Sequence, residues 1–231
     1  MRLPGPIVTG TLLGRRKRFF ADVSLDSGER IVAHVPNTGS MRGASEPGSP
    51  VALSHRPEPG RKLHWTLELV RSGDCWVGVD TALTNRIAEE AIRAGRIGPL
   101  RSWSSLRREV RYGERSRVDL LLEGKKGRCF VEVKNVSYRG GRRALFPDAV
   151  TERGARHLRE LEMMVREGHR AVIFFLVNRD DCGSFGPARE IDPAWGEALD
   201  RAVAAGVEPL AYRARNTLET SQIDKKLKVV L

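Results

Sequence analysis

The sequence predicts a two-domain α+β protein, with a small β-barrel in residues 1–80 and an α/β domain with a mixed sheet in residues 81–231. Short apolar segments separated by turn residues fill the first part, and helical patterns alternate with strand-like segments in the second. The run AVIFFLV, residues 171–177, is apolar throughout, as is typical of a strand covered on both faces. A chain of 231 residues has room for both cores.

Turn-rich spacing predicts the barrel. Turns such as DSGE, PNTGS and EPGSP separate the apolar segments, and several short strands in about 80 residues are typical of a small closed sheet. We therefore expect an OB-like β-barrel. The expected strand segments are PIVTGTLL, FFADVSL, RIVAHV, PVALSH, HWTLELV and CWVGVD.

The pattern changes near residue 81. Thr84 or Asn85 is expected to cap a helix that runs through IAEEAIRA and stops at Gly95. The strand-like segments REVRYG, RVDLLLE and RCFVEVK follow, and then the expected loop YRGGRRALFPDAV.

Two more helices alternate with strands in the last third of the chain. Thr151 is expected to cap a helix that ends at Gly168 and precedes the strand at residues 171–177. A third helix, PAWGEALDRAVAAG, leads to a strand near EPLAYRA, and KKLKVVL is either a strand or a basic tail. This order predicts a mixed sheet with helices on both sides.

The charge balance limits the classes of partner. Forty Lys and Arg against 29 Asp and Glu give a net charge of +11, spread over both halves of the chain. A basic surface favours polyanions such as nucleic acid or an anionic membrane, although it can also serve solubility alone. A membrane partner is not expected, because no basic amphipathic helix and no apolar run of spanning length is present.

Cysteine spacing and the N-terminus indicate the compartment. The three cysteines form no CxxC pair, which argues against a zinc site or a disulfide framework. The N-terminal residues MRLPGPIVTG contain no hydrophobic signal-peptide region. A cytoplasmic location is therefore expected.

Two acids and a lysine lie in the segment SRVDLLLEGKKGRCFVEVKN. Side chains alternate along a strand, so Glu132 and Lys134 share one face about 7 Å apart. The short connection EGKKGR predicts a hairpin that brings Asp119 alongside them. Neighbouring carboxylates repel, and a divalent cation removes the repulsion. The alternative is a buried ion pair of Lys134 with one acid, with Arg117 compensating the other.

Metal, carboxylates and lysine together predict phosphodiester hydrolysis. Bound Mg²⁺ polarises a phosphodiester and activates water, and a neighbouring lysine stabilises the charge of the transition state. We therefore expect a site for Mg²⁺ (or Mn²⁺) at these side chains.

Longer motifs extend this pattern to a family. Asp119 followed by Glu132-x-Lys134 resembles the PD-(D/E)xK nuclease signature, with Val118 where the signature usually has proline. In this order, KRFFADV, HVPNTGSM, YGERSRVDLLL, VEVKNVS, FPDAVTERGARHL and IDPAW resemble the sugar fermentation stimulation protein family over nearly the whole chain. The resemblance implies an OB-fold N-terminal domain, a PD-(D/E)xK (restriction-endonuclease-like) C-terminal domain and DNA binding. The motif implies nuclease activity more than the family name does, because that name describes a phenotype.

The nuclease signature assigns roles to the clustered residues. By resemblance, Asp119 and Glu132 become catalytic metal ligands, the backbone carbonyl of Val133 a third ligand and Lys134 the catalytic lysine. Glu109, in REVRYG, is the best candidate for a further acidic ligand. Its alternative role is that of a surface partner for a neighbouring arginine.

Five further residues, two on a helix and three in a turn, are candidates for contact with the nucleic acid backbone. Arg153 and His157 lie four residues apart on one helix face, where they can bind the scissile phosphate; the alternative is a core histidine and a solvated arginine. Asp148 is expected to brace the preceding loop, with catalysis as the alternative. The turn HVPNTGSM can offer backbone N–H groups to phosphate through Asn37, Thr38 and Ser40, or it can be a plain turn.

A basic and aromatic segment, RRKRFF, is expected in the barrel. We predict that it forms a strand with Arg16, Arg18 and Phe20 on one face. Basic and stacked aromatic side chains of this kind bind single strands in OB folds.

Two functions fit these observations. The first is a Mg²⁺-dependent nuclease acting on single- or double-stranded DNA. The alternative is a non-catalytic DNA-binding regulatory protein on a nuclease-like scaffold, linked to sugar metabolism. Retention of the two acids and the lysine favours the nuclease, and the oligomeric state is either a monomer or a homodimer.

Overall fold

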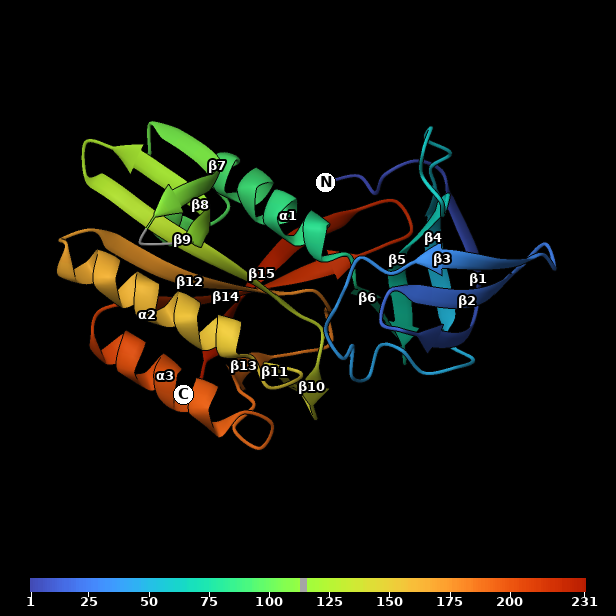
Figure 1. The fold of residues 1–231 in the computed structure, drawn as a ribbon. Helices are drawn as coiled ribbons and strands as arrows, with labels where there is room; N and C mark the ends of the chain where they lie inside the picture. Colours follow the sequence, from blue (N-terminus) through green and yellow to red (C-terminus); the bar gives the residue numbers. More distant parts are fainter. Residues whose placement is uncertain (113–115) are drawn as a thin grey trace.

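The computed structural model describes residues 1–112 and 116–231. Residues 113–115 lie outside the described part, and with them the end of the expected strand REVRYG and part of the stretch YGERSRVDLLL. The described chain contains a six-stranded and a nine-stranded sheet, which Figure 1 shows as two bodies side by side.

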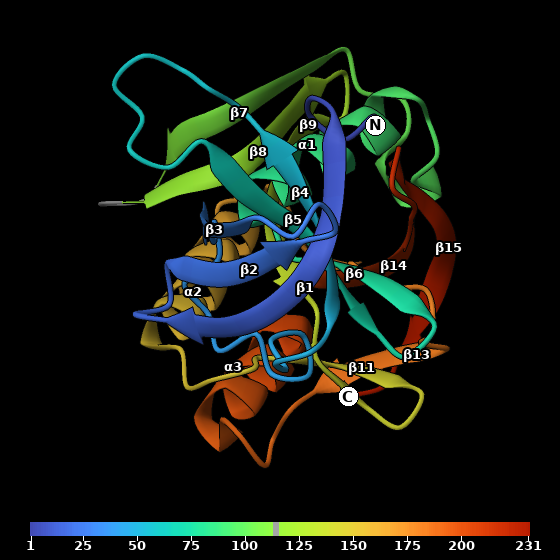
Figure 2. The ribbon, with the colours of Figure 1, turned by 90° about the vertical axis from the view of Figure 1, so that its right-hand side faces the viewer.

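The first sheet is an OB barrel, as expected. Its strand order is β3-β2-β1-β4-β5-β6, and a parallel pairing of β3 with β5 closes the first five strands. Alternation builds the core, since Ala21, Val23 and Leu25 of β2 all point inward. Figure 2 looks onto this barrel, with the second domain behind it. The strands are β1 (Ile7–Arg16), β2 (Phe20–Leu25), β3 (Arg30–His34), β4 (Pro50–His55), β5 (Trp65–Ser72) and β6 (Cys75–Gly78).

The second sheet is mixed and has the order β10-β11-β13-β15-β14-β12-β9-β8-β7. Its central strand β12 is parallel to both β9 and β14. The strands are β7 (Ser105–Tyr112), β8 (Ser116–Gly124), β9 (Gly127–Val136), β10 (Arg139–Gly140), β11 (Arg143–Phe146), β12 (Arg170–Val177), β13 (Ser184–Pro187), β14 (Glu208–Asn216) and β15 (Ser221–Val229).

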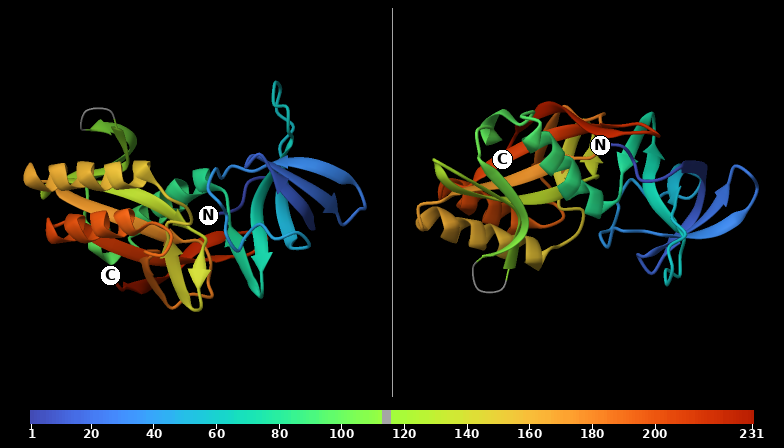
Figure 3. Two further views of the ribbon diagram at one scale, coloured as in Figure 1. Left: turned by 60° about the horizontal axis from the view of Figure 1, so that its bottom comes forward. Right: turned by 90° about the horizontal axis from the view of Figure 1, so that it is seen from above.

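Helices cover both faces of this sheet, which confirms the predicted layers. Helix α1 (Thr81–Arg93) lies on one face, and α2 (Glu152–Arg166) and α3 (Pro193–Ala204) lie side by side on the other (Figure 3). A short 3₁₀ helix, η1 (Gly98–Leu100), follows α1. The apolar run in β12 serves both layers, because Phe174 packs on the α1 side and Phe175 on the α2 side. No helix in the described ranges is long and apolar enough to cross a membrane.

The cap of α1 differs from the prediction. Asp80, and not Thr84 or Asn85, is the N-cap, and its side chain accepts a hydrogen bond from the Ala82 backbone N–H at 2.8 Å. The helix therefore begins three residues after β6 ends, which leaves almost no linker between the domains. The hydroxyl of Thr84 lies 3.2 Å from the side-chain oxygen of Asn135. The cap predicted for α2, Thr151, is confirmed.

The segment RRKRFF is a hairpin turn, so the prediction of one continuous strand there was wrong. Strand β1 ends at Arg16 and β2 begins at Phe20. Lys17 and Arg18 between them have φ of 50° and 62°, the left-handed conformation that a tight two-stranded hairpin needs. Arg16, Arg18 and Phe20 therefore do not share a strand face.

Short strands near the end of the sheet were also missed. The expected loop at residues 138–150 contains β10 and β11, and β13 had no counterpart in the prediction. These strands are two to four residues long. β10 forms a short hairpin with β11, whereas β11 and β13 are held by non-local pairing, since β11 lies parallel to β13 and β13 parallel to β15. The C-terminal segment, for which a strand or a basic tail was expected, belongs to β15.

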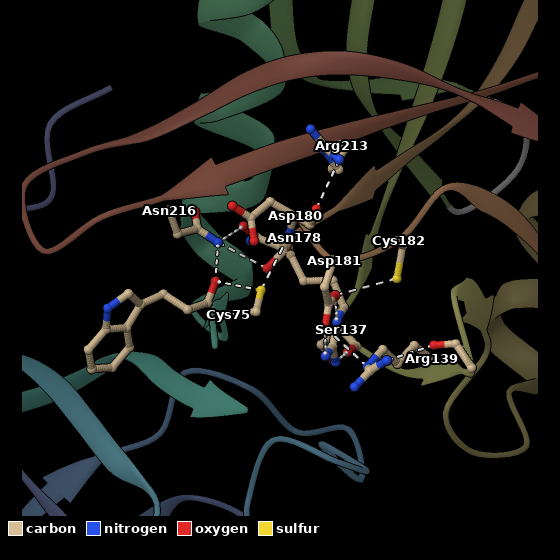
Figure 4. Close-up of polar contacts among 12 residues, drawn as sticks. Cys75, Ser137, Arg139, Asn178, Asp180, Asp181, Cys182, Arg213 and Asn216 are labelled. Atoms are coloured by element: carbon tan, nitrogen blue, oxygen red, sulfur yellow. Dashed lines mark hydrogen bonds and ion pairs between the residues drawn. The ribbon is translucent and has the colours of Figure 1, made fainter. Parts of the chain in front are cut away.

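Polar contacts fix the two domains against each other (Figure 4). Asn216 donates to the carbonyl oxygens of Trp76 and Asn178 at 2.9 and 3.0 Å, and the Gly78 backbone N–H donates to the Asn178 carbonyl at 2.8 Å. A Cβ on Gly78 would lie 2.4 Å from the side chain of Asn178, so this approach requires glycine. On the same seam, the Asp180 N–H donates to the sulfur of Cys75 at 3.3 Å.

Substitution of Asp192 tests how the helix layer is anchored. This buried carboxylate caps α3 through the Trp195 N–H at 3.0 Å and accepts the Thr151 N–H at 2.8 Å at the start of α2. Asp192→Ala should lower the free energy of unfolding by about 1–3 kcal/mol in urea denaturation. The control Asp200→Ala removes only an exposed ion pair and should cost less than about 0.5 kcal/mol. Equal losses in the two variants would contradict this account.

Candidate active site

The two acids converge where β8 and β9 part. Their backbone ladder ends at the pair Leu120 and Val131. Asp119 comes just before Leu120 on β8. Its side chain takes the place of the next backbone hydrogen bond, because its carboxylate accepts the Val133 N–H at 2.7 Å. Its other oxygen accepts a hydrogen bond from the side chain of Asn85 on α1 at 2.8 Å. The Asp119 carboxylate is thereby held over β9 next to Glu132.

Glu132, Lys134 and His157 form a tight cluster beside it. The Lys134 ammonium donates to Glu132 Oε1 at 2.7 Å and lies 3.1 Å from His157 Nδ1. His157, on α2, also contacts Glu132 Oε1 through Nδ1. The second oxygen, Glu132 Oε2, is buried and has no hydrogen-bond partner within residues 1–112 and 116–231.

The surroundings of the two carboxyl groups shift their pKa values in opposite directions. Burial, together with the neighbouring Glu132 charge, raises the pKa of Asp119 to about 6. Burial also disfavours the charge of Glu132, but Lys134 and His157 outweigh it and lower the pKa of Glu132. The single ammonium thus stabilises Glu132, while the charge of Asp119 is poorly compensated.

This donor set fits a small divalent cation. No three His, Cys, Asp or Glu side chains of the described residues come together as a ligand set. Mg²⁺ needs fewer, because it is held by one or two carboxylates and keeps several waters. Asp119, Glu132 and the Val133 carbonyl would supply the protein ligands. A cation there relieves both the unpartnered Glu132 oxygen and the repulsion that raises the pKa of Asp119.

The cluster forms the floor of an interdomain cleft of about 490 Å³. The barrel contributes one wall and the segment from Tyr138 to His157 the other, so neither domain alone makes the cleft. The lining residues named in the sequence analysis are Arg18, Asn37, Thr38, Asp119, Glu132, Val133, Lys134, Asp148, Arg153 and His157.

Asp148 braces one side of the cleft by joining the two walls. Its carboxylate accepts the Ser40 hydroxyl and the Met41 N–H, both at 2.9 Å. A Cβ on Gly39 would lie 3.0 Å from Asn37 Oδ1 and 3.3 Å from both Asp148 oxygens, so a larger residue would push against this turn. The guanidinium of Arg15 holds the turn at residues 37–40 in place by donating hydrogen bonds to the carbonyls of Asn37, Gly39 and Ser40.

The turn residues have separate tasks. Buried Asn37 accepts the Gly39 N–H at 2.8 Å and donates to the Val79 carbonyl at 3.1 Å, so its side chain shapes the turn. The hydroxyl of Ser40 is engaged with Asp148. Thr38 is exposed and lines the cleft, and Arg18 lies beside its carbonyl at 3.4 Å.

His157 and Arg153 occupy different depths. His157 is buried against the carboxylate cluster, and Arg153 is exposed, with its Nε 3.3 Å from His157 Nε2. Arg153 can therefore meet a phosphate in the cleft, whereas His157 orients Glu132 and Lys134. Phosphate binding by either residue stays a prediction.

Besides Ser40, three predicted residues do not line the cleft. Arg16 pairs with Asp22 at 2.8 Å, and its guanidinium lies 5.4 Å from the ring centre of Phe20 on the barrel surface. Glu109 is exposed on β7, between the cross-strand pairs Arg108–Leu120 and Val110–Val118, with φ of 52°. Its role as a metal ligand stays a prediction.

The sequence patterns did not reveal the site contacts of Arg15 and Asn85, and they left the role of Asp148 open. Arg15 and Asn85 act through contacts between segments far apart in the sequence, which no local pattern displays. For Asp148, both bracing and catalysis were considered, and the contacts fit bracing.

The fold and the site define a class: an OB barrel joined to a restriction-endonuclease-like domain. A family model described as the sugar fermentation stimulation protein RE domain matches residues 82–220, and one described as the SfsA N-terminal OB domain matches residues 13–79. The chain belongs to the sugar fermentation stimulation protein family.

Individual relatives match over their whole length. Sugar fermentation stimulation protein homologs from Pelobacter propionicus and Geobacter metallireducens are 54% identical over 231 residues and 55% identical over 232 residues, with 100% of both chains covered. The solved structure of Pyrococcus furiosus SfsA in complex with Ca²⁺ aligns with a TM-score of 0.91 at 30% identity. The alignment covers 100% of this chain and 98% of that one.

Cation binding should depend on pH through Asp119. Its pKa of about 6 means that protons compete with the cation below that pH. At about pH 7.5, a hundredfold excess of Mg²⁺ over its Kd should stabilise the protein by about 2–3 kcal/mol, a thermal shift of about 4–12 °C. The shift should shrink towards about pH 5 as the carboxyl is protonated.

Asp119→Asn should abolish the Mg²⁺-dependent shift, and the control Asp74→Asn, at a fully exposed turn residue, should keep it. A wild-type shift that is equal at both pH values, or one that survives Asp119→Asn, would contradict this assignment.

Proposed function

We propose that this protein binds DNA and hydrolyses its phosphodiester bonds with Mg²⁺ or Mn²⁺. The observation that carries the proposal is the floor of the cleft, where two carboxylates lie together, the Lys134 ammonium pairs with Glu132, and a buried Glu132 oxygen has no partner in the described chain. A purely structural ion pair would need one acid for one lysine, and the second acid costs stability. The Ca²⁺ in the Pyrococcus furiosus relative supports a cation site in this family.

Each residue of the floor has a chemical task. Asp119, Glu132 and the Val133 carbonyl would hold the cation, which when bound would supply Lewis-acid activation of the scissile phosphate and of the attacking water. Lys134, with its side chain 13% exposed, is placed to neutralise charge on the phosphate. His157 contacts Glu132 Oε1 and so keeps this carboxylate oriented. Arg153 and Arg18 stand on opposite walls, where they can hold the DNA backbone.

The alternative function is a DNA-binding regulatory protein that does not cut. The net charge of +11 and the basic walls of the cleft support DNA binding in both proposals. The two proposals differ in how they account for the floor of the cleft. A protein that only binds DNA has no use for two clustered carboxylates, because these repel phosphate.

A cleavage assay separates these functions. Wild-type protein should cut single- or double-stranded DNA with Mg²⁺ or Mn²⁺. Cleavage should stop when EDTA removes the metal. Lys134→Ala should lower the rate about a hundredfold or more, because one charge-stabilising donor is lost.

The matched control is Lys126→Ala in the exposed β8–β9 turn, which should cut normally. If wild-type protein binds DNA and cuts neither form with either metal, hydrolysis is excluded and the regulatory alternative holds.

Charge reversal should identify the DNA-binding wall. Arg18 lines the cleft, whereas Arg16 is occupied by Asp22 outside it. Arg18→Glu should weaken DNA binding and reduce the slope of log Kd against log salt by about 1, the loss of one phosphate contact. Arg16→Glu should change the slope much less. Equal effects, measured by fluorescence anisotropy at several salt concentrations, would place the binding surface elsewhere on the barrel.

A further inference from the structure

A second hollow adjoins the interdomain cleft. Its volume is about 440 Å³, and it is also lined by both domains. Tyr138 lines both hollows, so they adjoin at this residue. The residues that line the second hollow are Gly43, Ser72, Tyr138, Arg139, Gly141 and Arg179.

Tyr138 is exposed enough to present a stacking surface. Its side chain is half-buried, and the guanidinium of Arg42, from the barrel, lies 5.6 Å from the ring centre. Aromatic rings beside arginines in basic grooves are the platforms on which proteins stack unpaired bases. A base in a duplex is stacked and paired already, so only an unpaired base or a strand end can use this ring.

The second hollow also carries positive charge. Arg139 and the buried Arg179 both pair with Asp181, at 3.1 and 2.6 Å (Figure 4). Arg42 is exposed and forms no ion pair with any described residue. Three arginines against one carboxylate leave an excess of positive charge next to Tyr138, which suits a phosphate backbone.

The depth of the floor also favours an unpaired strand over a duplex. The side chains of Glu132 and Lys134 are only 3% and 13% exposed, and the bonds of Asp148 to Ser40 and Met41 join the walls above them. A duplex presents its phosphates on a wide convex surface and cannot follow the walls inward without unpairing. An unpaired strand is narrow and flexible enough to reach the floor.

We propose that the substrate is single-stranded DNA, which runs from the Asp119–Glu132 floor across Tyr138 into the second hollow. One base stacks on the Tyr138 ring, and the adjoining phosphates lie on Arg42 and Arg139. The inference rests on the proposed function, since it assumes that the cleft holds the scissile strand.

Binding measurements test this path without interference from cleavage. Full-length Lys134→Ala protein is titrated into fluorescein-labelled single-stranded DNA of about 12 nucleotides and into the matching blunt duplex, with Mg²⁺ present. The single strand should bind about tenfold more tightly than the duplex. Adding Tyr138→Ala should weaken single-strand binding about tenfold, the contribution of one stacked base, and leave duplex binding unchanged.

Matched variants control for folding and for general charge. Tyr138→Phe keeps the ring and should bind like its parent. Arg42→Ala should weaken single-strand binding, because Arg42 lies over Tyr138, which lines both hollows. Arg16→Ala removes another arginine over an aromatic ring, but that ring, Phe20, lines neither hollow, so this variant should bind like its parent. Thermal unfolding of each variant shows whether it is folded.

Each outcome has one meaning. Duplex binding as tight as single-strand binding, or unchanged affinity in folded Tyr138→Ala protein, would overturn the inference while wild-type cleavage still supports the proposed function. Binding of neither DNA form would overturn both. Single-strand binding that depends on Tyr138, without metal-dependent cleavage by wild type, would support the path and exclude hydrolysis.

Discussion

The site depends on the close approach of two carboxylates at the point where β8 and β9 separate. Because the backbone ladder stops at Leu120 and Val131, the Asp119 side chain takes the Val133 N–H and is drawn over β9. Glu132 has Lys134 and His157 as partners, but one of its oxygens has none in the described chain. The arrangement is electrostatically incomplete, and a divalent cation is the group whose charge and preference for oxygen ligands complete it.

The two domains act as one unit in this account. Asp80 begins α1 almost directly after the barrel, and Asn178 and Asn216 hold β6 against the large sheet. The carboxylate floor belongs to the second domain, but Arg18 and the turn at Asn37–Met41 belong to the barrel. The OB barrel therefore serves as a wall of the site.

Much of the fold and the centre of the site followed from local patterns. Period-two alternation placed Glu132 and Lys134 on one face of β9, and the apolar run of β12 indicated a strand buried on both sides. Local patterns do not contain the contacts that decide the rest. The hairpin turn at Lys17 and Arg18 depends on backbone conformation. β11 and β13 depend on non-local pairing, and the bracing by Asp148 joins segments more than 100 residues apart.

The central claim is that Asp119, Glu132 and the Val133 carbonyl bind one divalent cation. Anomalous diffraction from crystals soaked in Mn²⁺ tests it most directly, because the signal locates the metal independently of any assumed role. The account predicts a single strong peak within about 2.0–2.3 Å of oxygens from these three residues. The absence of a peak there, with the Lys134 ammonium still bound to Glu132 at saturating Mn²⁺, would contradict it.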